Sequence, residues 1–259
     1  GGDGEGGGGV KETMGTASSD LLKLARAMKM NTDVRRSIFV VLMSSEDCAD
    51  AMERLLKLRL KDKQEREIVR VLLHCCAQEK VYNPYYALVA QKFCGHGHGF
   101  KITLQFALWD SVKAMGADGA DGEEGSMDVR KVSHYARLYA YLIATESLTL
   151  GILKALNFTN LTPLQILFSQ LLFSSILTTA SASTSRKQAD PDAHIKTIFG
   201  RVTTGAAAEQ LEELREGIVF FMQQFLVGKQ GETVVKEGER ELVKRRVKVV
   251  KNVLVGKAV

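Results

Sequence analysis

Sulfur and imidazole side chains cluster at two places in the sequence, and these are the ligands that a zinc ion prefers. Cys94, His96 and His98 alternate with glycines, and His74, Cys75 and Cys76 precede them. The Cys-x-His-x-His spacing is not that of a zinc finger, and ligands two residues apart on a glycine-rich loop are poorly oriented for a tetrahedral ion. We therefore predict no metal site, but a solvent-exposed loop after a buried cysteine.

Acid–base chemistry has one candidate cluster, Glu65, Arg66 and Glu67. These residues fall in the first turn of a predicted helix, where carboxylates complement the helix dipole, so an ion pair or cap is favoured over catalysis. The phosphate-loop, His-Glu-x-x-His and Gly-x-Ser-x-Gly motifs are absent from the sequence. The glycines at 95–99 follow a helix and not the strand that a dinucleotide site requires. We predict a non-enzymatic protein without a cofactor.

Aromatic residues are interpreted mainly as core. Trp109, next to Asp110 near the end of an amphipathic helix, is typical of a buried tryptophan with one polar contact, and a partner-binding hot spot is the less favoured alternative. Three tyrosines are predicted to pack between helices: Tyr82, Tyr85 and Tyr86.

The C-terminal segment has the clearest functional pattern. Its apolar residues step by four, three and four positions and form one helical stripe: Val243, Val247, Val250 and Leu254. Basic residues occupy the remaining faces: Lys244, Arg245, Arg246, Lys248 and Lys251. Such a helix could bind RNA phosphates, an acidic protein groove or an anionic membrane surface. Equally, it could be a solvated face whose stripe docks on the rest of the protein.

Net charge draws attention to the same segment. The 259 residues carry 35 basic and 30 acidic side chains, a formal charge of +5. The last 31 residues hold nine basic and four acidic residues, so the whole excess lies there. With 45% apolar and 25% charged residues, the composition excludes a collagen-like, disulfide-scaffold or wholly disordered chain. The longest apolar run, Leu161 to Ala182, is interrupted by Pro163 and polar residues, so no membrane span or membrane partner is predicted.

Helical periodicity dominates the chain, and strand alternation is missing. Capping residues precede many apolar runs; Thr32, Ser44 with Asp47, and Asn83 followed by Pro84 are examples. We predict an all-α fold, a HEAT-like stack of antiparallel helix pairs with a basic C-terminal helix. The expected helices include Ile102 to Met115, Asp128 to Ala144, Ser147 to Leu156, Thr162 to Thr179, Asp192 to Arg201, Ala206 to Leu226 and Val234 to Leu254.

Composition also predicts the domain boundaries. Seven of the first nine residues are glycine, which indicates a linker over residues 1–19 and a segment of a longer protein, with order beginning near Asp20. A helical domain is expected at 20–227, with a glycine-rich acidic insertion at 117–127, followed by the basic helix or tail at 228–259. The four cysteines favour reduced, mostly buried thiols in an intracellular protein.

Several segments together carry a resemblance to a known family. Met43-Ser-Ser-Glu-Asp, Leu55-Leu-Lys-Leu and Gln64-Glu-Arg-Glu-Ile-Val-Arg-Val-Leu are similar to the first half of an MA-three (MA3) domain, the all-helical module of initiation factor 4G and of the programmed-cell-death suppressor of translation. His74-Cys-Cys-Ala-Gln-Glu-Lys, the run from Asn83 to Cys94, and Lys101-Ile-Thr-Leu-Gln-Phe-Ala-Leu-Trp-Asp resemble the nucleolar family that also carries an initiation-factor-4G middle domain.

That resemblance implies a scaffold in the nucleus and nucleolus, acting in small-ribosomal-subunit assembly and 18S rRNA processing. Its implied partners are pre-ribosomal proteins, pre-rRNA and a DEAD-box helicase of the initiation-factor-4A type, the helicase mainly through an upstream domain. The basic residues of the C-terminal segment are then the candidate RNA contacts. Two alternatives stay open: a spliceosomal scaffold of the same two-domain family, and a translation-type regulator that binds such a helicase directly.

Overall fold

The computed structural model describes residues 19–117, 127–179, 190–205, 208–228, 231 and 233–256. Within these ranges every regular element is a helix, and no strand occurs, so the predicted all-α fold is confirmed. The glycine-rich start up to residue 18 and most of the acidic insertion lie outside the described ranges.

The chain forms two compact units, which divide between Cys75 and Cys76. In the first unit, residues 19–27 are helical and are followed by α2 (Asp33–Ser44), α3 (Cys48–Lys57) and most of α4 (Glu65–Gln78). Thr32 caps α2 as predicted, because its hydroxyl accepts a hydrogen bond from the Arg35 N–H. Of the predicted pair Ser44 and Asp47, Asp47 is the N-cap of α3, because its carboxylate accepts hydrogen bonds from the Ala49 and Asp50 N–H groups.

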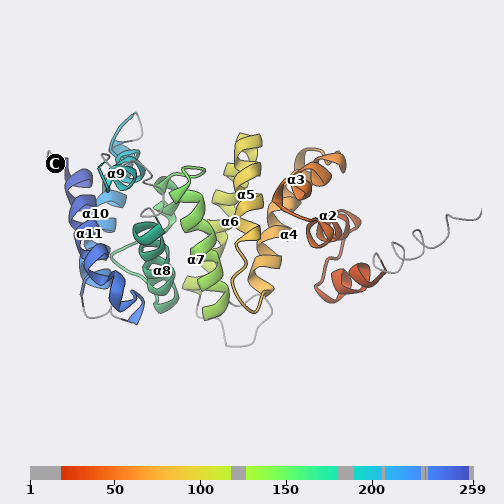
Figure 1. Cartoon of the computed structure of the whole chain (residues 1–259), viewed down its shortest axis with the longest axis horizontal. Helices are drawn as coiled ribbons and strands as arrows, with labels where there is room; N and C mark the ends of the chain where they lie inside the picture. Colours follow the sequence, from red (N-terminus) through yellow and green to blue (C-terminus); the bar gives the residue numbers. More distant parts are fainter. Residues whose placement is uncertain are drawn as a thin grey trace, which may run out of the picture. The chain divides into compact units, whose positions relative to one another are not determined.

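The second unit starts with a group of packed helices. Its helices α5 (Tyr85–His96), α6 (His98–Gly116), α7 (Val129–Ala144) and α8 (Pro163–Thr179) are labelled in Figure 1. α5 packs against α6 and α7, and α8 packs against α6 and α7. A 3₁₀ helix, η2 (Leu150–Ala155), stands between α7 and α8 where a longer helix was expected. Tyr139 and Phe168, both fully buried, belong to the core of this unit. The predicted helical stack is therefore present here.

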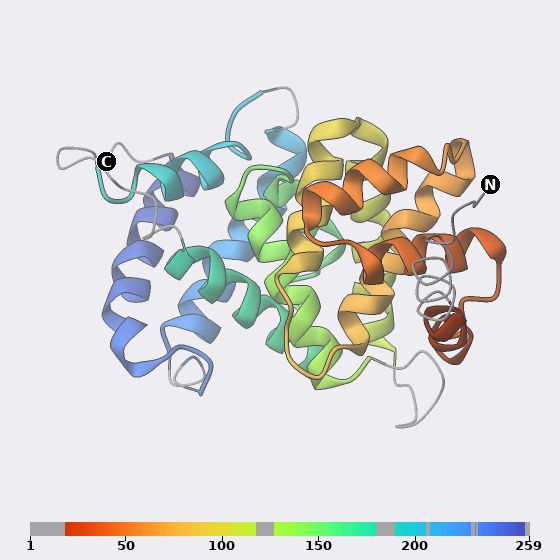
Figure 2. The ribbon, with the colours of Figure 1, turned by 45° about the vertical axis from the view of Figure 1, so that its right-hand side comes forward.

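The last elements of the second unit are α9 (Ala193–Gly200), α10 (Glu212–Phe221), the π turn η4 (Met222–Leu226) and α11 (Arg240–Val255). α11 packs against α8, α9 and α10 (Figure 2). It starts six residues later than predicted, after a 3₁₀ turn over Glu237–Glu239. The domain boundary expected at residue 227 stays a prediction.

The predicted loop after Cys94 is wrong in its extent. α5 continues through Gly95 to His96, and α6 begins at His98, so only Gly97 interrupts the two helices. Gly97 is extended and donates its N–H to the Phe93 carbonyl. The ring of Phe93 then packs on Phe100, with centroids 4.7 Å apart. This packing supports a helix start that the glycine-rich sequence conceals.

Candidate nucleic-acid interface

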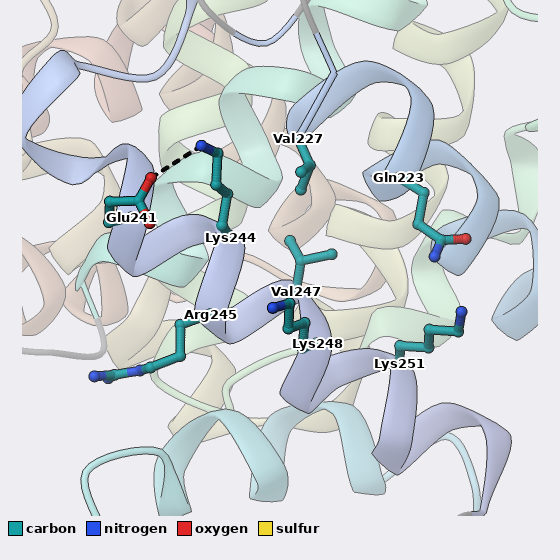
Figure 3. A pocket seen from close by; sticks show the side chains of 8 residues that line it. All are labelled: Gln223, Val227, Glu241, Lys244, Arg245, Val247, Lys248 and Lys251. Atoms are coloured by element: carbon teal, nitrogen blue, oxygen red, sulfur yellow. Dashed lines mark hydrogen bonds and ion pairs between the residues drawn. The ribbon is translucent and has the colours of Figure 1, made fainter.

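The exposed face of α11 borders a groove of about 470 Å³, shown in Figure 3. We call it the basic groove. Gln223 and Val227 come from the η4 region, and all other lining residues come from α11: Glu241, Lys244, Arg245, Val247, Lys248 and Lys251. Four of the five basic residues predicted as RNA contacts are therefore brought together at one surface.

The apolar stripe of α11 orients these cations. Val243, Val247, Val250 and Leu254 are all buried, as their spacing predicts for a face that docks on neighbouring helices. Lys244, Lys248 and Lys251 follow one another at helical spacing, so they share a face and lie ~6 Å and ~4.5 Å apart along the axis. The docking stripe and the solvated basic face thus coexist on one helix.

The cations of the groove differ in how far they are neutralised. The Lys244 ammonium lies 2.9 Å from a Glu241 carboxylate oxygen, but both side chains are exposed, at 47% and 86%, so water screens this pair. Lys248 and Lys251 are exposed and form no ion pair with a carboxylate in the described part of the chain. These two lysines are therefore the least neutralised cations of the groove.

Arg245 and Arg246 share one carboxylate but have different surroundings. An Arg245 nitrogen lies 3.3 Å from the Asp192 carboxylate, and its side chain is 55% exposed at the edge of the groove. The Arg246 Nε lies 3.0 Å from the same oxygen, and its side chain is only 1% exposed. Its other nitrogens donate to the carbonyls of Leu177 and Pro191.

Arg246 corrects the sequence-based assignment. Its guanidinium is enclosed and hydrogen-bonded inside the protein, so it cannot reach an RNA phosphate at the surface. Burial of a charged group is tolerated when it is paired and hydrogen-bonded, and these partners meet that requirement. Arg246 instead attaches α11 to the segment before α9 and to the end of α8.

The chemistry of the basic groove suits an extended anion. Its lysines provide point charges along the helix, while Val227 and Val247 form an apolar floor. Among the described residues no aromatic side chain lines it, so these residues offer no platform on which bases could stack. Contacts of this kind position a nucleic-acid backbone and do not read its sequence.

The other candidate residues of the sequence occupy structural positions. Glu67 lies 2.5 Å from Arg35 and 2.9 Å from Arg70, so it belongs to an ion-pair cluster of the first unit, as the sequence favoured. Trp109 donates its indole N–H to the Ile152 carbonyl at 2.8 Å, the predicted polar contact. Tyr86 is buried, and its hydroxyl donates to Glu79 at 2.9 Å.

Several cysteine and histidine side chains are buried and pack in the interior. Cys75, Cys76 and Cys94 are buried, and burial raises the pKa of the Cys76 thiol to about 12 and that of Cys94 to about 11. His134, which the sequence did not single out, is buried with Nδ1 2.9 Å from the Cys76 carbonyl. In the described ranges no three metal-ligating side chains gather. The absence of a metal site stays a prediction.

In the described ranges, no helix has the length and apolar character needed to cross a bilayer.

The sequence matches a known protein family and several known proteins. Residues 34–149 match the MA3 domain family. The chain is 37% identical to human nucleolar MIF4G domain-containing protein 1 over 248 residues, which are 96% of this chain and 26% of that protein. It is 41% identical to suppressor of glycerol defect protein 1 of Schizosaccharomyces pombe over 162 residues, 62% of this chain and 21% of that protein.

A splicing relative is more distant. The pre-mRNA-splicing factor CWC22 homolog of Caenorhabditis elegans is 26% identical over 128 residues, 49% of this chain and 13% of that protein. The chain thus spans about a quarter or less of the length of the relatives described here.

Proposed function

Because residues 34–149 of this chain are an MA3 domain, we propose that the protein is a helical scaffold in nucleolar small-ribosomal-subunit assembly and 18S rRNA processing. One observation carries the proposal: a protein named nucleolar is similar over 96% of the chain. The splicing relative is similar over only 49% and at lower identity. Nucleolar and nuclear localisation is part of the same proposal.

The RNA contact of this scaffold is assigned to the basic groove. Lys244, Arg245, Lys248 and Lys251 supply its cations, with Lys248 and Lys251 contributing most because they lack a described carboxylate partner. A backbone-directed contact suits a factor that holds folded pre-rRNA within a particle, since it needs charge and position and no base recognition.

A non-enzymatic role agrees with the chemistry of the described residues. The Glu67 carboxylate is engaged by two arginines. The Cys76 and Cys94 thiols are neutral at physiological pH because burial raises their pKa. Pre-ribosomal proteins are the further partners of this proposal.

Crosslinking of the full-length protein in its own cells, followed by sequencing of the bound RNA, tests the proposed function. We expect enrichment of pre-18S sequences, reduced when Lys248 and Lys251 are both replaced by Ala. Replacing Lys63 and Lys80, two exposed lysines outside the groove, is the matched control. Enrichment of intronic or spliceosomal RNA in place of pre-rRNA would overturn the proposal in favour of a splicing scaffold.

A helicase of the initiation-factor-4A type is a proposed protein partner. A pull-down with purified helicase separates two roles for this chain. Retention by the chain alone would indicate the translation-type regulator, whereas retention only by the full-length protein agrees with a scaffold that recruits the helicase through another domain.

A further inference from the structure

One face of α6 exposes an apolar stripe that the proposed function does not use. Ile102, Phe106 and Trp109 follow one another at helical spacing and define what we call the α6 stripe. Ile102 is 42% exposed and Phe106 is 53% exposed. The opposite face of α6 is buried through Leu104, Leu108, Val112 and Met115, and the helix packs on α5, α8 and η2. The core thus fixes α6, while Ile102 and Phe106 are exposed and Trp109 is half-buried.

The two aromatic rings of the stripe are held in place before any partner binds. Trp109 donates its indole N–H to the Ile152 carbonyl at 2.8 Å, and the Lys154 ammonium lies 4.9 Å from the centre of its ring. Phe106 meets Trp109 edge to face, with centroids 5.2 Å apart and planes at 81°. Rigid aromatic side chains lose little conformational entropy on binding, which is typical of interface hot spots.

Positive charge stands at one end of the stripe. Lys113 follows Trp109 by one helical turn, and Lys154 lies over the Trp109 ring. Neither lysine forms an ion pair with a carboxylate in the part of the chain that the structure describes. Asp110, which is exposed on the adjoining flank of α6, offsets one of these two positive charges. An acidic group on a partner would be attracted to this end.

We propose that the α6 stripe is a docking site for a protein partner, namely an amphipathic segment with two apolar side chains at helical spacing followed by acidic residues. The apolar pair would cover Ile102 and Phe106, and the carboxylates would meet Lys113 and Lys154. RNA fits less well, because Ile102 is not planar, Lys154 occupies a face of Trp109, and its indole N–H is already donated.

Selection from a displayed library of random 16-residue peptides tests this site without knowledge of the natural partner. We expect enriched peptides to carry two apolar residues three or four positions apart and carboxylates after them. Phe106→Ala should weaken their binding at least tenfold, as truncation of an aromatic hot spot does. Phe220→Ala, a change of another exposed phenylalanine on α10, should leave it unchanged.

Charge reversal supplies the second variant. Lys113→Glu should weaken the binding of the acidic peptides and strengthen the binding of peptides in which lysines replace the carboxylates.

Circular dichroism establishes that each variant is folded. Absence of enrichment, enrichment of peptides without carboxylates, or equal binding by Phe106→Ala would each overturn the proposal. Loss of binding to a uridine-rich RNA by Phe106→Ala would assign the stripe to RNA instead. The Lys248→Ala/Lys251→Ala variant retains the α6 stripe and should still bind the peptides. A failure of RNA binding at the basic groove is therefore distinguishable from a failure of peptide binding at the α6 stripe.

Discussion

Arg246 determines how the C-terminal helix is attached. Its side chain is the only basic one of the helix that is buried in the described ranges, and Asp192 compensates its charge. Asp192 stands at the N-cap position of α9 but forms no capping bond, since its carboxylate is bound by Arg246 and Arg245. A residue type that normally caps a helix is used here to join two segments.

Replacing Asp192 with Ala should therefore destabilise the protein strongly. Breaking a buried pair leaves an uncompensated charge, and we expect the free energy of unfolding to fall by about 3 kcal/mol, measured by urea denaturation. Arg245→Ala removes only the half-exposed member and should cost less than about 1 kcal/mol. Equal losses in the two variants would contradict this assignment.

The burial of each cysteine determines the reactivity of its thiol. Cys76 and Cys94 have raised pKa values, and Cys75 is buried, whereas Cys48 is partly accessible. Since the thiolate is the reactive form, iodoacetamide at pH 8 should modify Cys48 alone in the native protein and all four cysteines in denaturant. Mass spectrometry of the alkylated protein measures this. Rapid native labelling of Cys76 or Cys94 would show that their helices are not packed as described.

The effect of a glycine-to-alanine substitution on stability depends on the space around the helix position. We expect opposite effects at two glycines. A Cβ at Gly217 of α10 would lie 2.9 Å from the Cβ and Cδ2 of Phe158, so Gly217→Ala should cost about 1–3 kcal/mol despite the better helix propensity of alanine. At Gly95 of α5 a Cβ would meet nothing within 4 Å. Gly95→Ala should therefore stabilise the protein by about 0.5 kcal/mol. Thermal unfolding compares the two variants, and a stabilised Gly217→Ala would contradict the packing of α10 on Phe158.

Elements were predictable where local signals agree with packing. Thr32, Asp47 and the apolar periodicity of α11 indicate helices whatever surrounds them. The break at Gly97 was misjudged because glycine permits both helix and loop, and the contact of Phe93 with Phe100 decides between them. The η2 segment is likewise tighter than its sequence indicates.

At the scale of the whole molecule, the predictable part of the candidate site is its exposed charge. The spacing of Lys244, Lys248 and Lys251 from the valine stripe places them on the solvated side of the helix. Arg246 borders that stripe, and its burial depends on Asp192, 54 positions earlier in the chain, which no local pattern reveals. The groove also needs Gln223 and Val227 from another element. Sequence reasoning thus located the basic helix, and tertiary packing decided which cations remain available.

The salt dependence of RNA binding tests the central claim most directly. Affinity for a single-stranded fragment of pre-18S rRNA, measured by fluorescence anisotropy at several salt concentrations, should fall linearly with salt concentration on a double-logarithmic plot, because binding releases counterions from the RNA. Loss of two lysine–phosphate contacts in Lys248→Ala/Lys251→Ala should reduce the magnitude of that slope by about 1.4 and lower the affinity. Lys63→Ala/Lys80→Ala, with the same change of charge outside the groove, should match the unmodified protein. Identical slopes and affinities for all three proteins would contradict the assignment of RNA binding to the basic groove.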